Sequence, residues 1–222
     1  MAHYRGNSMN FSDPDDQPIN LISSRFRTYL PIVIDIETAG FNAKTDAILE
    51  IAAVVLGMDD AGILAPTQTL FHRVIPFKGA NLEEAALKFT GIDPFHPLRI
   101  AQSEADVFQS LFNMVKAAVK SSDCKRAIIV AHNAHFDHGF INAAADRLQI
   151  KRNPFHPFSS FDTATLSGLA YGQTVLARAC ETAGIEFDSA QAHSARYDAD
   201  RTAKLFCKIV NKWQSLGGWP LS

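Results

Sequence analysis

The strongest constraint on the fold of this chain is the stretch PIVIDIET at residues 31–38. Its first four residues are apolar and mostly β-branched, which is typical of a buried central strand. Asp35 and Glu37 lie two residues apart, so on a strand both carboxylates should point to the same face. Two like charges so placed raise each other's pKa unless a cation lies between them, and oxygen ligands suit Mg²⁺ or Mn²⁺. The alternative is a solvated acidic pair at a strand end.

Composition limits the possible classes of protein. The 222 residues are 47% hydrophobic, which is enough for one domain with a sizeable core. The formal net charge of −2 gives no overall basic field, so nucleic acid would have to bind at a local patch. Cys124, Cys180 and Cys207 lack metal-ligand spacing and indicate a reducing compartment, the cytoplasm. We expect no secretory signal and no transmembrane segment.

The order of elements predicts an α/β fold, with a mixed five-stranded sheet flanked by helices on both faces. Residues 1–24 are polar and turn-rich, and we expect a flexible tail there and a single domain over residues 25–222. The first three strands should form an antiparallel meander. The strands are expected at about 31–37, 48–56, 69–76, 127–131 and within 155–162. The helices are expected at about 82–89, from 103, and at 137–148, 163–169, 174–183 and 194–215, with a capping box at 81–84.

Two further acids and a histidine follow far downstream of the first pair. Asp137 lies where the strand at 127–131 gives way to a helix, and Asp198 lies in the last helix, five residues after His193. The carboxyl ends of strands in an open α/β sheet meet at one edge, where ligands bind. We therefore expect Asp137 to join the first two acids there, and Asp198 to join them if the last helix crosses that edge.

Taken singly, each of these residues has a structural interpretation. Asp137 could cap a helix, and Asp198 could pair with Arg196 or Arg201 on a solvated face. His193 could be a capping or core histidine. A zinc site is a separate alternative, although the oxygen-rich surroundings favour a harder ion. Its ligands would be His132, His135 and His138.

The ordered pattern D-x-E, D, H-x₄-D resembles the DEDDh exonucleases, a DnaQ-like family of the ribonuclease H-like superfamily. The resemblance extends from about residue 25 to residue 213, and it is carried by the stretches DIETAGF, AHNAHFDHGF, NPFHPFSSFDTATL and AHSARYDADRTA. It implies a ribonuclease H-like fold and 3′→5′ exonuclease activity. It also implies two Mg²⁺ ions in each active site, for which Mn²⁺ can substitute.

The resemblance assigns a role to each residue of the pattern. Asp35, Glu37 and Asp198 would bind the metals, with Asp35 bridging both, and Asp137 would support the second metal through water. Two metals about 3.5–4 Å apart stabilise the attacking and leaving oxygens of an in-line displacement. His193 would be the general base that takes a proton from the attacking water, and its imidazole could touch a metal in other poses.

Four of the 16 phenylalanines adjoin a loop or an acidic motif, and the resemblance implies that they bind substrate. Aromatic faces stack on unpaired bases for about 1–3 kcal/mol each, so these rings would hold the last two nucleotides of a single strand. They are Phe41, Phe89, Phe136 and Phe158, and core packing is the alternative for each. One turn before Phe89, where family members carry a glutamate, this chain has Ala85 beside Glu83 and Glu84. Because stacking needs unpaired bases, cleavage should stall near a duplex.

Seven basic residues are candidate phosphate contacts, although each could simply be solvated. They are Arg25, Arg27, Lys120, Lys125, Arg126, Lys151 and Arg152. In the family a comparable patch on one subunit faces the active site of the other. The resemblance therefore implies a C₂ homodimer.

These observations favour a Mg²⁺-dependent 3′→5′ exoribonuclease that trims single-stranded 3′ ends of stable RNAs, such as tRNA and rRNA precursors, and releases 5′-monophosphates. The first alternative is a single-stranded DNA exonuclease in proofreading or repair, because the acids do not specify the sugar. A second alternative is a binding module that has lost catalysis. The complete set of acids argues against it.

Overall fold

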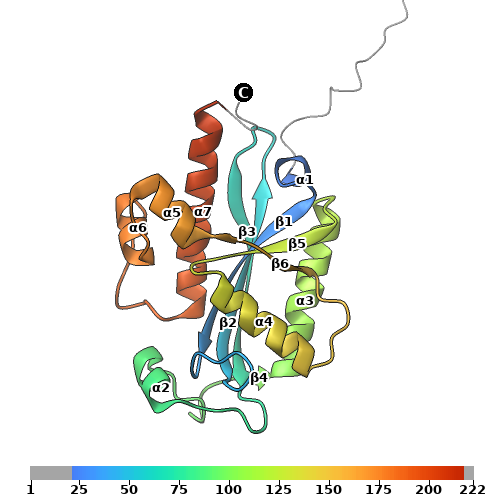
Figure 1. Ribbon diagram of the computed structural model, residues 1–222, viewed down its shortest axis with the longest axis vertical. Coiled ribbons are helices and arrows are strands. Elements are labelled where there is room, and N and C mark those ends of the chain that lie inside the picture. The colour runs from blue at the N-terminus through green and yellow to red at the C-terminus, as the bar shows by residue number, and fades with distance from the viewer. Residues whose placement is uncertain (1–21, 218–222) are drawn as a thin grey trace, which may run out of the picture.

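Two long apolar strands form the centre of the molecule. The computed structural model describes residues 22–217. Strand β1 (Tyr29–Thr38) and strand β2 (Ile48–Met58) are buried along nearly their whole length. Strands that are apolar on both faces require cover on both faces, and Figure 1 shows helix α7 on one side of the sheet and helix α3 on the other. The α/β class with flanking helices is confirmed.

The sheet is mixed and has the strand order β4-β3-β2-β1-β5-β6. Strands β1, β2 and β3 (Leu64–Ile75) form the expected antiparallel meander, and β5 (Arg126–Ala131) and β6 (Phe155–Asp162) continue parallel to β1. The expected count of five strands is wrong. The sixth strand, β4 (Gln102–Ser103), is a two-residue segment that pairs with the end of β3, and it is too short to show a sequence pattern.

Seven helices accompany the sheet in the described residues. They are α1 (Ile22–Arg25), α2 (Glu84–Thr90), α3 (Glu104–Ser121), α4 (His135–Arg147), α5 (Thr163–Tyr171), α6 (Leu176–Thr182) and α7 (Ala195–Ser215). Helix α3 begins after Ser103, whose hydroxyl accepts a hydrogen bond from the N–H of Asp106 at 3.1 Å. Its buried stripe includes Phe108 and Phe112, as the sequence period predicts. No helix within residues 22–217 is long and apolar enough to cross a membrane.

Three predictions about boundaries are wrong, and one is the start of β3, which lies at Leu64 rather than at about residue 69. Residues 22–24 belong to α1 rather than to a tail, because Ile22 packs into the main core. Residues 1–21 lie outside the described part of the chain. The capping box at Asn81 is also absent, since α2 begins after Glu83 without a side-chain cap. The Asn81 side-chain amide instead donates to Asp46 Oδ1 at 3.0 Å, on the loop between β1 and β2.

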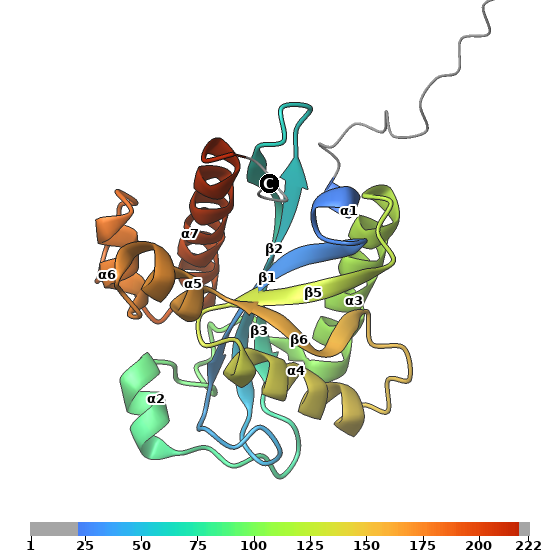
Figure 2. The same cartoon turned by 45° about the horizontal axis from the view of Figure 1, so that its top comes forward.

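The acids of β1 lie beyond its pairing with β5. The two strands pair from Tyr29 to Val33, and β1 then continues alongside β2 alone. Chain connections cluster at this end: the loop after β1, the turn from β5 into α4, and the segment leading to α2. Figure 2 shows α2 set apart from the other helices, near this end of β1. The last residues of β1 are themselves largely buried, and they thus lie where several other elements begin.

Candidate active site

Strand β1 delivers two carboxylates to the same face. Asp35 pairs with Ala52 of β2, and Glu37 pairs with Glu50 two positions further along the ladder. Glu37 is buried, with 8% of its surface exposed, whereas Asp35 is partly exposed. The alternative interpretation, a solvated acidic pair at the strand end, is therefore wrong for Glu37.

Helix α4 brings the third acid against β1. The helix begins at His135, so Asp137 lies in its first turn and is not the N-cap; that position belongs to Ala134. The Asp137 carboxylate is buried, and it accepts a hydrogen bond at 3.2 Å from the N–H of Ile36, the residue between the first two acids. This contact fixes the third carboxylate beside the other two.

Helix α7 brings the fourth acid and positions the histidine loop. Asp198 lies in the first turn, and its Oδ2 accepts a hydrogen bond at 3.0 Å from the N–H of His193. The alternative in which Asp198 forms an ion pair with Arg201 is wrong, because the Arg201 guanidinium lies 3.2 Å from Asp200 instead. His193 has a left-handed backbone, with φ of 64°, and its side chain is exposed rather than in the core.

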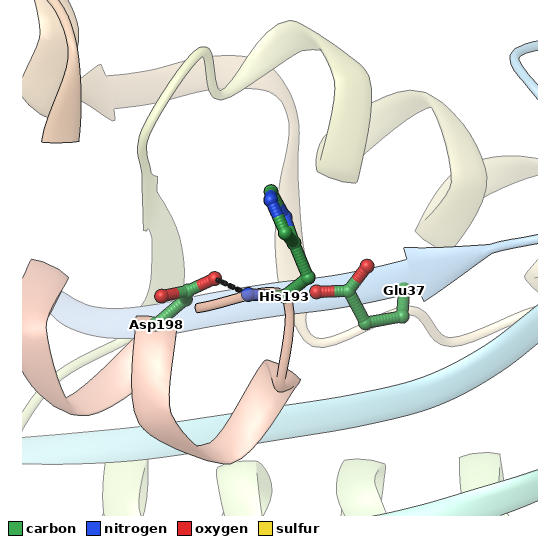
Figure 3. Close-up of side chains that lie close together, drawn as sticks. All are labelled: Glu37, His193 and Asp198. Atoms are coloured by element: carbon green, nitrogen blue, oxygen red, sulfur yellow. Dashed lines mark hydrogen bonds between the residues drawn. The ribbon is translucent and has the colours of Figure 1, made fainter. Parts of the chain in front are cut away.

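Glu37, His193 and Asp198 offer ligand atoms that all lie within 4.8 Å of one another. Figure 3 shows how the three come together from β1, the loop before α7, and α7 itself. Asp198 Oδ1 is buried and makes no hydrogen bond within the described residues. An orphaned carboxylate oxygen beside other acids matches the coordination that a hard divalent cation needs. The residues present therefore fit a metal site.

Electrostatics support the same conclusion. Burial, with added repulsion from Asp198, Glu50 and Asp137, raises the pKa of Glu37 to about 8. Burial also raises the pKa of Asp137 to about 8, although its hydrogen bond from Ile36 acts in the opposite direction. A cation among these groups would remove the repulsion and restore the ionised forms.

The other two acids are shifted in the same direction. Burial and the charges of Asp137, Asp198 and Glu37 raise the pKa of Asp35 well above its usual range. Burial likewise raises the pKa of Asp198, while the N–H and the charge of His193 lower it. All four acids of the pattern therefore lie in one cluster, where the charges of Asp137 and Asp198 act on both Asp35 and Glu37.

The zinc alternative does not fit. His132 is engaged through both ring nitrogens: Nδ1 lies 3.0 Å from the Thr163 hydroxyl, and Nε2 lies 2.8 Å from the Thr174 carbonyl oxygen. His138 is buried, whereas His135 is exposed. Over residues 22–217 the only group with metal-ligand spacing is the one around Glu37.

Glu50 is a fifth acid that the sequence interpretation missed. It is buried on β2 directly opposite Glu37, and its Oε1 lies 3.4 Å from the guanidinium of Arg73 on β3. The guanidinium of Arg99 donates a hydrogen bond to the carbonyl oxygen of Leu49, the residue before Glu50. The available signal was a lone charge inside the apolar strand at 48–56, which is rare unless the charge is paired.

Three of the four predicted phenylalanines lie close to the acids. The ring centroids of Phe41 and Phe136 lie 6.1 Å apart, and those of Phe89 and the His193 imidazole lie 4.3 Å apart. Phe41 is 83% exposed and Phe89 is 68% exposed, so core packing is excluded for both. Phe136 is half-buried against Phe140. Phe158 is 80% exposed in an irregular part of β6, where its ring meets His156 at 4.6 Å.

The predicted basic residues gather at the opposite end of the sheet. Arg126 pairs with Tyr29 at the start of β1, and the N–H of Lys125 donates to the Thr28 carbonyl at 2.8 Å, close to Arg25 and Arg27. Because β6 begins beside the start of β5, the segment before β6, with Lys151 and Arg152, lies at this end too. Lys120 lies in the last turn of α3, just before β5 in the chain. At about 3.3 Å per residue, the six residues from Tyr29 to Asp35 separate this end from the acids by about 20 Å.

Comparisons with known proteins agree with this geometry. A family profile described as Exonuclease (RNase_T) matches residues 32–206. Curated proteins named ribonuclease T are similar throughout: that of Photorhabdus laumondii subsp. laumondii is 62% identical over 94% of this chain and 96% of the relative. That of Vibrio cholerae serotype O1 is 63% identical over 90% of each chain.

Solved structures show the same fold. Escherichia coli exonuclease I in complex with a dT13 oligonucleotide superposes with a TM-score of 0.63 at 17% identity, over 85% of this chain and 42% of that one. A full-length 3′-exonuclease superposes with a TM-score of 0.65 at 18% identity, over 83% of this chain and 61% of that one. The chain spans less than two thirds of either structure, and at this identity the likeness concerns the fold alone.

Proposed function

Since the chain belongs to the ribonuclease T family of exonucleases, we propose that it is a Mg²⁺-dependent 3′→5′ exoribonuclease. It would trim single-stranded 3′ ends of tRNA and other stable RNAs and release 5′-monophosphates. The observation that carries the proposal is the grouping of Glu37, His193 and Asp198 within 4.8 Å, beside Asp35 and Asp137. This arrangement supports the proposal because it has the acids and the histidine that the family's pattern would bring together.

Each residue of the cluster has a definable task. Asp35, Glu37 and Asp198 would hold two divalent ions, and Asp137 would support the second through water. Such ions, when bound, stabilise the charge that develops on the attacking and leaving oxygens of the phosphodiester. A ring nitrogen of His193 accepts the proton of the attacking water, and the exposed side chain can pass that proton to solvent.

The exposed rings give the site its preference for unpaired ends. Phe41 and Phe89 lie beside the acids and would stack on the terminal bases, with Phe136 supporting Phe41. Because Phe89 already contacts His193, an entering base would rearrange the catalytic loop as it binds. Phe158 would contact the strand further from the acids. Stacking requires bases that are not paired, so trimming should stop near a stem.

The basic end of the sheet supports a homodimer. It lies about 20 Å from the acids of its own subunit by strand length, so the last two nucleotides over the acids would not contact it within one chain. A C₂ partner would place this basic end beside the other subunit's acids.

The three cysteines are free thiols, which supports a reducing compartment, the cytoplasm.

The direct test is a 5′-labelled RNA hairpin with a single-stranded 3′ tail. With Mg²⁺ we expect products that shorten one nucleotide at a time and accumulate near the stem, and EDTA should stop the reaction. Internal cuts, or undiminished activity in EDTA, would refute the proposal. A matched DNA tail separates the two sugars, and faster trimming of DNA would favour the DNA exonuclease instead.

A further inference from the structure

Asp46 is a buried carboxylate that the proposed reaction does not use. It lies in the loop between β1 and β2 and has no exposed surface. Its Oδ2 accepts a hydrogen bond from the N–H of Asn42 at 2.9 Å. Its Oδ1 accepts hydrogen bonds from the Thr45 hydroxyl at 2.7 Å and the Asn81 side-chain amide at 3.0 Å. Burial opposes ionisation, but these donors outweigh it and lower the pKa of Asp46, so the group is charged at neutral pH.

The carboxylate joins two segments that are far apart in the sequence. Backbone hydrogen bonds run between them: the N–H of Asn81 donates to the Thr45 carbonyl at 2.8 Å, and the N–H of Glu83 donates to the Ala39 carbonyl at 2.8 Å. Apolar side chains pack beneath this junction, among them Leu49 and Leu87. Residues 39–47 and 80–83 thus form one unit with Asp46 inside it.

Each segment carries one exposed ring of the site. Phe41 lies in the first segment, and the second leads directly into α2, which carries Phe89. Beyond the contacts of Phe41 with Phe136 and of Phe89 with His193, these rings are 83% and 68% exposed, so packing adds little to fix their direction. Their separation therefore depends on the backbone that Asp46 holds together.

The fit around the carboxylate is tight. A Cβ placed on Gly40 would overlap Asp46 Oδ2 and would lie 3.0 Å from Glu83 Cδ. Glycine is therefore required next to Phe41 for the two segments to approach this closely.

We propose that Asp46 is a positioning residue for substrate, because it holds Phe41 and Phe89 at the spacing that the 3′-terminal nucleotides need. The inference rests on the proposed function, since it takes these two rings as the stacking surface. Asp46 does not touch the reacting atoms. Its effect reaches the substrate through the two rings.

The test variant is Asp46→Asn, which keeps the volume but turns one acceptor into a donor that faces other donors. We expect the KM for the tailed hairpin to rise about tenfold, within the range of about 5- to 150-fold for one lost base stack. The kcat should change far less. The matched control is Asp59→Asn, since Asp59 also accepts backbone N–H groups in a turn but lies at the far end of β2.

A second readout reports stacking without catalysis. RNA with 2-aminopurine at its 3′ end should show a fluorescence change on binding in EDTA, and Asp46→Asn should reduce this change as Phe41→Ala does. In a background that lacks both rings, Phe41→Ala with Phe89→Ala, Asp46→Asn should add little to KM, because its effect reaches the substrate through these two rings. A merely structural role would instead lower Tm and leave both the KM and the fluorescence signal at the wild-type values, which would overturn the inference.

The design separates this inference from the proposed function. If Phe41→Ala itself leaves KM unchanged, the stacking surface is wrong and the proposed function is at fault. If Phe41→Ala raises KM but Asp46→Asn does not, only the role of Asp46 fails. Should Asp46→Asn not fold, Asn81→Ala removes a single donor and should raise KM in the same direction by a smaller factor. An unchanged KM in that variant would also overturn the inference.

Discussion

Glu37 is a carboxylic acid whose surroundings favour its protonated form. It is buried opposite Glu50 and close to Asp198, and its pKa rises to about 8. The four acids of the site repel one another in the absence of a cation and so oppose stability, whereas the proposed function requires each of them. Substitutions should therefore separate the two properties.

Asp35→Asn tests this separation directly. Removal of one charge should nearly abolish Mg²⁺-dependent trimming, by at least about 10²–10³-fold as for other groups that stabilise a transition state. At pH 8 in EDTA it should raise Tm by about 2–4 °C for each kcal/mol of repulsion removed. Glu181→Gln, which removes the exposed partner of Arg178 on α6, is the control and should change neither. Retained turnover would exclude Asp35 from the mechanism.

Asp137 combines a charge with a structural hydrogen bond. Asp137→Asn keeps an acceptor for the N–H of Ile36, whereas Asp137→Ala leaves that buried donor without a partner. Both variants should lose activity, but only the alanine variant should lose about 1–3 kcal/mol of unfolding free energy. Urea denaturation of the pair measures the difference. Equal stability of the two variants would argue against the hydrogen bond.

At the scale of elements, α4 is attached to α3 by a buried ion pair. Arg147 donates to both oxygens of Glu104, at 3.0 and 2.6 Å, and its guanidinium lies 3.8 Å from the ring centre of Phe77. Only 5% of the Glu104 side chain is exposed. This contact sets the position of the helix that carries Asp137.

Arg147→Met should therefore be severely destabilising. It leaves a buried carboxylate unpaired, which typically costs about 3–5 kcal/mol, and the partial exposure of Arg147 favours the lower end. Arg178→Met is the matched control, because its pair with Glu181 is about 70% exposed on both sides and should contribute little. Urea denaturation curves measure both effects. Similar midpoints for the two variants would contradict the prediction.

At the scale of the whole molecule, the acid cluster links metal binding to stability. Glu37 and Asp137 have folded-state pKa values near 8, above their usual values of 4.5 and 3.8. Between those limits the folded chain binds more protons than the unfolded chain, so stability must fall as the pH rises. A bound cation replaces the protons and removes this loss.

We therefore expect the Tm in EDTA to fall between pH 5 and pH 8, and Mg²⁺ to raise it most at pH 8. Differential scanning fluorimetry across this range measures both effects. Asp35→Asn should flatten the dependence, which identifies the cluster as its source. An equal effect of Mg²⁺ at pH 5 and pH 8 would contradict the linkage.

The proposed dimer makes a different prediction about the whole molecule. A triple variant that reverses three charges of the basic end, Arg27→Glu, Arg126→Glu and Lys151→Glu, should be inactive on tailed RNA. The Asp35→Asn variant should also be inactive. Mixed subunits should recover up to about half of the activity per active site, because one heterodimer site combines intact acids with an intact partner patch. Recovery measured after co-refolding tests this arrangement. No recovery in a verified heterodimer would show that the patch does not act across the interface.

The order of D-x-E, D and H-x₄-D along the chain was enough to predict the fold class, the family and the four acids. Local rules succeed there because strand alternation puts Asp35 and Glu37 on one face, and because apolar periodicity marks β1, β2, α3 and α7. The two-residue β4 and the helical turn at Ile22 carried no such pattern and were missed.

Only the tertiary structure decided which partners the individual polar groups find. It paired Glu50 with Arg73, gave Asn81 to Asp46 instead of to a helix end, and placed Asp137 against the N–H of Ile36. These contacts join positions that are from 23 residues (Glu50 and Arg73) to 101 residues (Ile36 and Asp137) apart. A hydrogen bond or a charge pair depends on distances of a few ångströms in space. Sequence spacing specifies such distances only within a single helix or strand, so the rest had to come from the folded chain.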